Sequence, residues 1–364
     1  MIYFMILTVI LFILMANIIL NKKEYRMIPM FIFYVTSFIL LLVISGFRGS
    51  DVGTDTSMYV RAFNLMKNSQ SLSLYKDRFE IGYRIFNLAI AKYFSSASVL
   101  LFMSSLLILV LIFWIFKKRS YYMWCSIIIY ILLMMYYNSM CLMRQYIAIS
   151  ISCIAIYFLS EKKNMKFIFF VLLSSTFHSS AIIVLILYPL SKIELTRYNR
   201  YLIVAITIVF LLFFDKLLNY LIYFIPKYST YINSKYYLEN QLAAILKAGV
   251  WISIYIFKDY VYFKYQIFDN NKIHKSWYKI EYYCAFLGAI ISFISIKGAI
   301  LERMGLYFTI INCITIPNAL YSIENRSKKY LCAGIILFMC LMYNLVILGF
   351  RPYWSGVIPY SFWN

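Results

Sequence analysis

Long apolar runs, separated by short polar and basic segments, make up most of the chain. About 20 apolar residues cross a bilayer as a helix, because each adds 1.5 Å along the axis and the hydrocarbon core is about 30 Å thick. We therefore expect an all-α, polytopic membrane protein. The pattern predicts spanning helices near residues 2–20, 27–46, 98–116, 121–137, 145–159, 201–225, 241–257, 280–297, 304–320 and 330–350.

Basic clusters in six loops orient these helices. Cytoplasmic loops carry an excess of lysine and arginine, so we place all six loops on the cytoplasmic side. The clusters are Lys22/Lys23/Arg26, Lys117/Lys118/Arg119, Lys162/Lys163/Lys166, Lys192/Arg197/Arg200, Lys258/Lys264/Lys272/Lys275/Lys279 and Arg326/Lys328/Lys329.

One apolar segment, residues 167–190, has basic loops at both ends. A single crossing would place every later basic loop outside, whereas a hairpin of two short helices keeps all six inside. Each arm would have about 12 residues and be about 18 Å long, which is tolerated inside a bundle around a cavity. The pattern thus predicts about twelve membrane segments, with Phe177–Ser180 at the hairpin tip and both termini outside.

Two outer segments stand out in this topology. The loop 47–97 is the largest, and its second half predicts an amphipathic helix near 79–95 that lies at the membrane interface. The tail 351–364 is rich in aromatic residues, as is the loop 226–240. No repeat or soluble domain is visible, so we expect residues 1–364 to form one transmembrane domain, with the first run retained as a span.

Composition excludes the soluble classes. Of the 364 residues, 63% are apolar and 13% are charged, against about 45–50% and 25% in soluble domains. The net charge of +21 reflects loops that face anionic lipid, so we expect no nucleic-acid partner. The seven cysteines form no CxxC pair, and the sequence carries no P-loop, HExxH or GxSxG motif. We therefore expect no disulfide framework, no metal and no cofactor.

Charged side chains within or at the mouth of apolar spans are costly and mark candidate functional sites. In the predicted topology they gather on the outer face, where one cavity can collect them. The candidates are Arg48, Asp51, Asp55, Tyr59, Glu80, Arg84, Arg144, His178, Glu302, Arg303 and Arg351.

The chemistry of these side chains suits lipid-linked sugars. Arginine presents a planar fork and keeps its charge, so several arginines favour a diphosphate. Aspartate, glutamate and histidine can take a proton from an attacking hydroxyl, and outer tyrosines and tryptophans can stack on sugar faces.

Several candidates also have an ordinary structural explanation. An arginine at the end of a span, such as Arg48 or Arg84, often anchors the helix among lipid headgroups. Aspartate favours turns and helix caps, which would account for Asp51 and Asp55. A histidine at a helix junction, such as His178, is often neutral and hydrogen-bonded.

The motifs follow one another in a recognisable order. The first outer loop reads Phe47-Arg48-Gly49, then Val52-Gly53-Thr54-Asp55-Thr56 and Tyr59. After it come Glu80-x-Gly82-Tyr83, Arg144-Gln145-x-x-Ala148, Phe177-His178-Ser179, Glu302-Arg303 with Tyr307, and the aromatic tail Trp354 to Tyr360. In these motifs the chain resembles the EpsG family of Wzy-type polysaccharide polymerases over nearly its whole length.

That resemblance implies a reaction and a place. A growing glycan would pass from undecaprenyl diphosphate to the non-reducing end of a lipid-linked oligosaccharide repeat unit. The reaction would take place at the outer face of the bacterial inner membrane, in an architecture that is GT-C-like by analogy. The implied partners are membrane lipids, a chain-length regulator and a flippase.

The resemblance also implies roles for residues. Arg48, Arg144 and Arg303 would hold the diphosphate and stabilise its leaving charge. The same substrate site would include Tyr59, Glu80 and Arg351. His178 or Asp55 would be the base, with His178 favoured because its ordinary pKa lies near neutral pH, and Glu302 would orient an arginine or the sugar.

Three other functions remain open at this point. A flippase would carry polar residues along a path through both halves of the membrane. A glycosyltransferase that uses polyprenyl-phosphate sugars would need acids in the first outer loop, where Asp51 and Asp55 lie. An O-antigen ligase would share the donor and differ in its acceptor.

Overall fold

The computed structural model describes residues 27–194, 241–264, 272–296 and 301–363 continuously, together with residues 3, 8–12 and 14 and scattered residues between 196 and 220. These parts are helical, as expected, and the one β-bridge among them joins Arg48 to Phe362. The expected spans at 2–20 and 201–225 lie largely outside the described residues, and the loop 226–240 lies wholly outside them.

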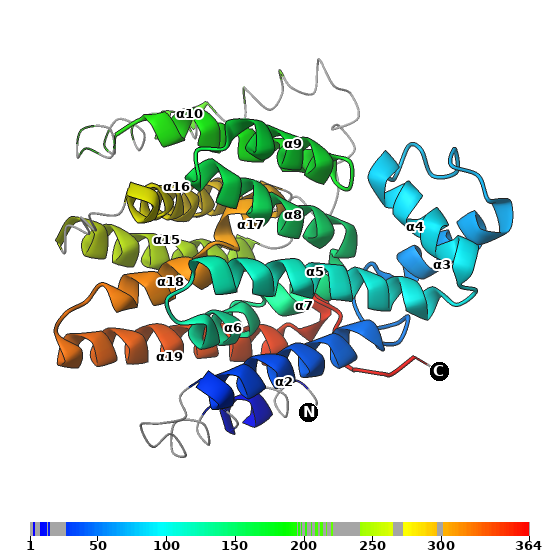
Figure 1. Ribbon diagram of the computed structural model, residues 1–364, viewed down its shortest axis with the longest axis horizontal. Helices are drawn as coiled ribbons and strands as arrows, with labels where there is room; N and C mark the ends of the chain where they lie inside the picture. Colours follow the sequence, from blue (N-terminus) through cyan, green and yellow to red (C-terminus); the bar gives the residue numbers. More distant parts are fainter. Residues whose placement is uncertain are drawn as a thin grey trace.

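Most helices run roughly along one axis of the molecule (Figure 1). The first half contains α2 Met27–Gly46, α3 Thr56–Ser69, α4 Ile81–Tyr93, α5 Ala97–Arg119, α6 Met123–Leu132, α7 Met135–Cys141, α8 Met143–Ser160 and α9 Asn164–Ser175. The second half contains η1 Ser179–Ile186, α10 Leu187–Lys192, α15 Gln241–Lys264, α16 Lys272–Ile294, α17 Glu302–Thr309, α18 Asn312–Tyr321, α19 Arg326–Phe350 and η4 Pro352–Trp354.

Four helices in the described part of the chain are long and apolar enough to cross a membrane, or five if one bent pair counts as a span. The bent pair is α6 and α7, which meet at 57°. Met134 takes the left-handed conformation at that bend, with φ of 64°, so the apolar segment expected as a span at 121–137 is broken into two helices. The described helices do not establish twelve segments, and that number stays a prediction.

The two short helices expected within 167–190 are present. Helix α9 ends at Ser175, the chain turns through residues 176–178, and η1 then runs back beside α9 into α10 (Figure 1). Both arms pack against other helices: Val171, Ala181 and Val184 are fully buried. Ser174 in α9 also donates a hydrogen bond of 2.6 Å to the Ala148 carbonyl in α8.

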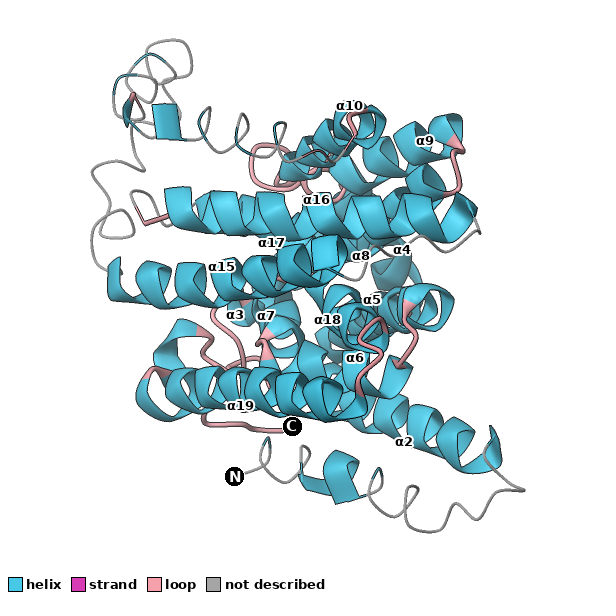
Figure 2. Ribbon diagram, turned by 90° about the vertical axis from the view of Figure 1, so that its left-hand side faces the viewer, coloured by secondary structure: helices cyan, strands magenta, loops and turns pink. Residues whose placement is uncertain are grey.

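The axis gives the molecule two distinct ends. Helices α3 and α4, which we call the arm, stand beyond one end of the bundle (Figure 1). Helix α5 starts beside the arm and its 23 residues carry the chain about 34 Å to the opposite end. Helices α8 and α17 begin at the arm end, where Arg144 contacts Glu80 and Gln145 contacts the Arg303 carbonyl. In the turned view of Figure 2, α15, α16 and α19 run in nearly the same direction.

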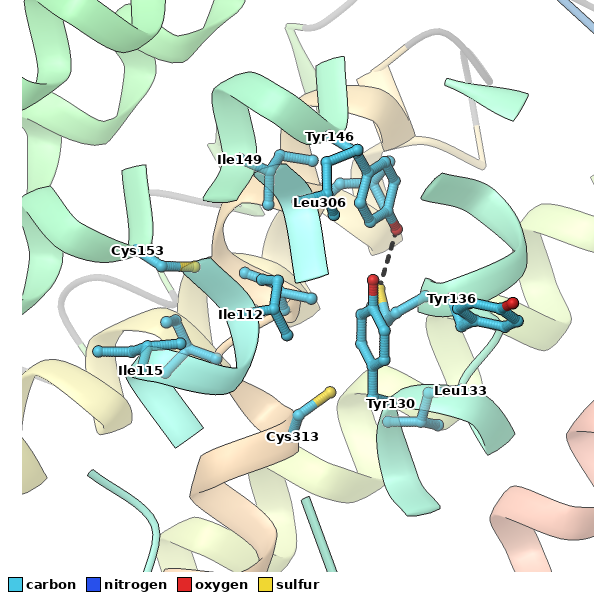
Figure 3. Packing of buried hydrophobic residues seen from close by; sticks show 14 of the residues in the cluster. Ile112, Ile115, Tyr130, Leu133, Tyr136, Tyr146, Ile149, Cys153, Leu306 and Cys313 are labelled. Atoms are coloured by element: carbon cyan, nitrogen blue, oxygen red, sulfur yellow. Dashed lines mark hydrogen bonds between the residues drawn. The ribbon is translucent and has the colours of Figure 1, made fainter. Parts of the chain in front are cut away.

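The middle of the bundle is an apolar core (Figure 3). Ile112, Ile149 and Cys313 are fully buried there. The buried hydroxyl of Tyr146 donates a hydrogen bond to the Met135 sulfur at 3.2 Å, and the thioether is a weak acceptor. Uncharged polar side chains such as Ser152, Asn312 and Asn344 are also buried in the bundle, whereas the ion pairs Arg144–Glu80 and Lys258–Glu281 lie toward its two ends.

Candidate functional site

The loop between α2 and α3 is held by the C-terminal tail. The Gly53 amide donates to the Gly356 carbonyl at 2.7 Å, and the Gly49 amide donates to the Ser361 carbonyl at 2.9 Å. Gly53 has φ of 99°, a conformation that favours glycine, and a Cβ there would lie 3.1 Å from the Met140 carbonyl. This explains the glycine of the Val52-Gly53-Thr54-Asp55 segment, which sets the start of α3.

Arg48 lies in this loop and is fully buried. Its guanidinium donates to the Met140 carbonyl at 3.0 Å, to the Ser105 hydroxyl at 3.3 Å and to the Ser45 carbonyl. These contacts join the end of α2 to α5 and α7. Arg48 therefore has a structural position, away from solvent, and its predicted contact with a diphosphate stays a prediction.

Glu80 lies where the arm meets the hairpin tip. Its Oε1 accepts a hydrogen bond of 2.9 Å from the Ser179 amide, and its Oε2 accepts one from Arg144. The start of α4 can lie this close to the hairpin tip because residue 82 is glycine: a Cβ there would lie 2.3 Å from the Thr176 hydroxyl oxygen. The Gly82 amide in turn donates to the Thr176 carbonyl at 2.8 Å.

Arg144, in the first turn of α8, links three segments. Its Nη1 donates to the Arg78 carbonyl at 3.0 Å and to Glu80, and the guanidinium lies over the Phe79 ring at 5.0 Å. Its Nε has no hydrogen-bond partner in the described part of the protein. Tyr59 is buried beside Phe79, and the centroids of the two rings are 6.2 Å apart.

His178 sits at the hairpin tip. Its Nδ1 lies 2.7 Å from the Ser180 hydroxyl and 3.4 Å from the hydroxyl of buried Tyr307 in α17. Both contacts use Nδ1, so Nε2 is the nitrogen left for a substrate. Glu80, Arg144, His178, Arg303 and Tyr307 are called the arm-end cluster below.

Burial and neighbouring charges in the arm-end cluster shift the pKa values of Glu80 and His178. Burial would raise the pKa of Glu80, but Arg144 and the Ser179 amide outweigh burial and hold that pKa below its ordinary value. Burial, together with the charges of Arg144 and Arg303, lowers the pKa of His178 to about 4, although Glu80 opposes the shift. The imidazole is therefore neutral at pH 7, and the ordinary pKa that favoured His178 as the base does not apply here.

The start of α17 adds two charges with different surroundings. Glu302 pairs with Lys247 of α15 at 2.8 Å. Arg303 is exposed, and its side chain has no ion pair or hydrogen bond within the described residues. Its backbone carbonyl accepts a hydrogen bond of 2.6 Å from Gln145, which fixes the start of α17 beside α8.

The tail contributes an aromatic surface beside this pair. Trp354 lies between two cations, Lys247 and Arg351, each 5.7 Å from its ring. Arg351 is exposed and donates a hydrogen bond of 2.8 Å to the Tyr353 hydroxyl. The arm end therefore combines unpaired cations with a tryptophan face.

The sequence model of the EpsG family matches residues 31–362. The chain belongs to the EpsG family. No curated protein and no solved structure matches it. Family membership and the apolar helices identify a membrane protein of polysaccharide biosynthesis with a polymerase-type function.

The EpsG-family chain brings some predicted residues together and separates others. Glu80, Arg144 and His178 interact directly with one another or through Ser179. Asp55, at the start of α3, has no side-chain hydrogen bond to the helix it precedes. Asp51 accepts a hydrogen bond from the Ser361 hydroxyl at 2.5 Å, and Arg84 donates to the Leu72 carbonyl, so these two stabilise loops.

Two residues of the site escaped the sequence analysis. Lys247 falls inside the span expected at 241–257, where an intramembrane charge is itself a signal of function. Gln145 was noted only as part of a motif, yet its buried Oε1 has no partner within the described chain. The sequence could not predict that either residue contacts α17, because Lys247 lies 55 residues from its partner Glu302 and Gln145 lies 158 residues from Arg303.

Proposed function

We propose that this EpsG-family protein is a membrane glycosyltransferase that polymerises lipid-linked oligosaccharide repeat units. It transfers the growing glycan from undecaprenyl diphosphate to the non-reducing end of the next unit. The acceptor hydroxyl attacks the anomeric carbon of the donor, the bond from that carbon to the diphosphate oxygen breaks, and undecaprenyl diphosphate leaves. The hydroxyl proton passes to a base on the protein.

The observation that carries this proposal is the arm-end cluster with its unpaired cations. Arg303 is exposed and has no acidic partner among the described residues, and Arg144 pairs with Glu80 while its side chain remains 15% exposed. Two guanidinium groups of this kind suit a diphosphate and stabilise the charge that develops as it leaves. Arg351 and Trp354 supply a cation and a ring for the sugar.

His178 and Asp55 remain the two candidate bases. The cations near His178 make the neutral imidazole a weak base in the free protein. A bound diphosphate would neutralise Arg144 and Arg303, and the pKa of His178 would then rise toward the working pH. Glu302 is engaged by Lys247, so its role is to position that lysine beside Trp354.

The core argues against the flippase alternative. A transporter needs a polar route between its two ends. The described layer between the two ends is filled mainly by apolar side chains such as Ile112 and Ile149 (Figure 3), and its buried polar residues, Ser152 and Asn312 among them, carry no charge.

The proposal places the protein in the bacterial inner membrane, with the arm end facing the exterior and about twelve segments. The chemistry it describes needs no metal ion. A glycosyltransferase that uses polyprenyl-phosphate sugars is the second candidate, because Asp55 is a free acid in the first outer loop. Activity that is lost with EDTA and restored by Mg²⁺ would favour this second candidate.

Deletion of the gene in its host, followed by gel analysis of the surface glycan, tests the proposal. A polymerase deletion leaves a single repeat unit on the acceptor. A flippase deletion leaves units on the inner face, and a ligase deletion leaves full-length polymer on the lipid carrier. Either of the last two patterns would overturn the proposal. Complementation with Arg303→Gln should fail, whereas Arg84→Gln, at an arginine that only holds a loop, should restore chains.

A further inference from the structure

The end of the bundle opposite the arm holds a second group of buried charges. Lys258 of α15 and Glu281 of α16 form an ion pair of 2.8 Å in which neither side chain is exposed. Glu281 also accepts hydrogen bonds from the Trp277 indole at 2.6 Å and the Asn318 amide at 2.5 Å. Every donor in this Glu281 network, which we define as Lys258, Trp277, Glu281 and Asn318, meets an acceptor.

Arg119, the last residue of α5, lies against this network but is not satisfied. Its side chain is 6% exposed, and its guanidinium is stacked between the rings of Tyr157 at 4.5 Å and Trp277 at 5.1 Å. Nη2 donates to the Ser160 hydroxyl at 2.9 Å and to Glu161. Nε is buried and has no partner within the described chain.

Arg119 lines a small cavity of about 80 Å³. The other lining residues are Lys118, Ser120, Tyr121, Trp277 and Tyr278. This lining has two cations and three hydroxyl groups but no carboxylate. The acids nearest to it, Glu161 and Glu281, are already paired with Arg119 and Lys258.

The size and the depth of the cavity restrict its ligand. The cavity is small, at about 80 Å³, and its cationic lining suits a compact anionic group such as a phosphate. Helix α5 is about 34 Å long, slightly more than the hydrocarbon core, so its last residue lies at headgroup level if its first does. Tryptophan and tyrosine are the residues that proteins place at that level.

We propose that this cavity is a phosphate-binding site for an anionic group, separate from the arm-end cluster. The Lys118 ammonium donates to the phosphate oxygens, the charge of Arg119 in the cavity wall attracts the anion, and the hydroxyl groups of the lining complete the site. The ligand is either the headgroup of an anionic phospholipid in that leaflet or free phosphate. The Tyr157 and Trp277 rings beside Arg119 hold its guanidinium in place before the ligand arrives.

The full-length protein in neutral detergent tests this site by native mass spectrometry. It is titrated with dioleoylphosphatidylglycerol, with dioleoylphosphatidylcholine and with inorganic phosphate. Lys118→Gln removes a cation that lines the cavity. Lys117→Gln is the matched control, because Lys117 carries the same charge one residue earlier and does not line it.

Lys118→Gln should weaken binding of the first phosphatidylglycerol about fivefold relative to Lys117→Gln, the effect of one well-placed cation near a lipid headgroup. Phosphatidylglycerol bound in preference to phosphatidylcholine and not displaced by millimolar phosphate identifies a lipid headgroup. Displacement by phosphate identifies the free ion. Equal weakening by both variants, or by neither, would overturn the proposal, because it would leave only general surface charge.

Discussion

The two ends of the bundle both gather charge inside a largely apolar protein, but they use it differently. In the Glu281 network the ion pair is fully buried and each side chain has its partners. In the arm-end cluster Arg144 and Glu80 are 15% and 22% exposed. There Arg144 Nε is unpartnered, and Arg303 has no acidic partner among the described residues.

This difference separates stability from binding. A saturated, desolvated pair fixes how helices pack, because removing either partner leaves a costly buried charge. An unsaturated cation next to solvent costs less to maintain and is available to an anion. The Glu281 network and the arm-end cluster should therefore respond oppositely to substitution, the first in stability and the second in activity.

The largest expected effect concerns Lys258. Lys258→Met leaves the Glu281 carboxylate buried without its cation and should lower the free energy of unfolding by about 3–5 kcal/mol. SDS-induced unfolding in mixed micelles measures this loss.

A double variant is the control for charge. Lys258→Met with Glu281→Gln removes both charges and keeps an amide oxygen for Trp277 and Asn318, so it should recover most of the stability. A double variant as unstable as the single one would show that the pair matters through packing alone.

Arg144 should behave in the opposite way. Arg144→Gln removes a donor to the leaving diphosphate and should lower the polymerisation rate about 10²–10³-fold, with little change in stability because the pair is partly solvated. Polymer formation in membranes measures the rate, and Arg84→Gln serves as the matched control. A similar loss in both variants would assign Arg144 a loop-holding role.

Arg48 should differ from Arg144 and Arg303, the two arginines with which the sequence analysis had grouped it. Arg48→Ala leaves the Met140 and Ser45 carbonyls without their donor at a fully buried position. It should cost about 2 kcal/mol of stability, so activity would fall with the amount of folded protein. The measurement is polymer formed per folded protein molecule, which should not change. A lower activity per folded molecule would instead favour direct contact between Arg48 and the substrate.

The smallest effect concerns the protonation of His178. Because its pKa is lowered to about 4, the imidazole should remain neutral and reactive toward diethylpyrocarbonate at pH 5.5. Between pH 7 and pH 5.5 its rate should fall less than about twofold, whereas N-acetylhistidine should lose about eightfold. Peptide mapping by mass spectrometry gives both rates, and parallel losses would contradict the lowered pKa.

The sequence predicted the helices well where apolar runs decide them. The hairpin around His178 followed from the basic loops on both sides, and the amphipathic pattern near 79–95 is present as α4. The bend at Met134 was missed because no glycine or proline marks it.

Pairings across long sequence distances were beyond the sequence. The list of embedded polar residues expected on the outer face did not include Lys258 and Glu281, which form a buried ion pair at the opposite end of the bundle. Both residues had been assigned by position alone, Lys258 to a basic loop and Glu281 to a span. The burial of Arg48 could not be predicted either, because it depends on Met140 of α7, which lies 92 residues further along the chain.

The most direct test of the account is the binding of a soluble polyprenyl diphosphate, farnesyl diphosphate, to the purified protein by calorimetry. Arg144→Gln with Arg303→Gln should weaken binding at least about tenfold, since two charge-assisted contacts are lost. The folded Lys258→Met/Glu281→Gln variant should bind like the original protein. Unchanged affinity in the arginine variant, or equal losses in both variants, would contradict the assignment of the diphosphate to the arm end.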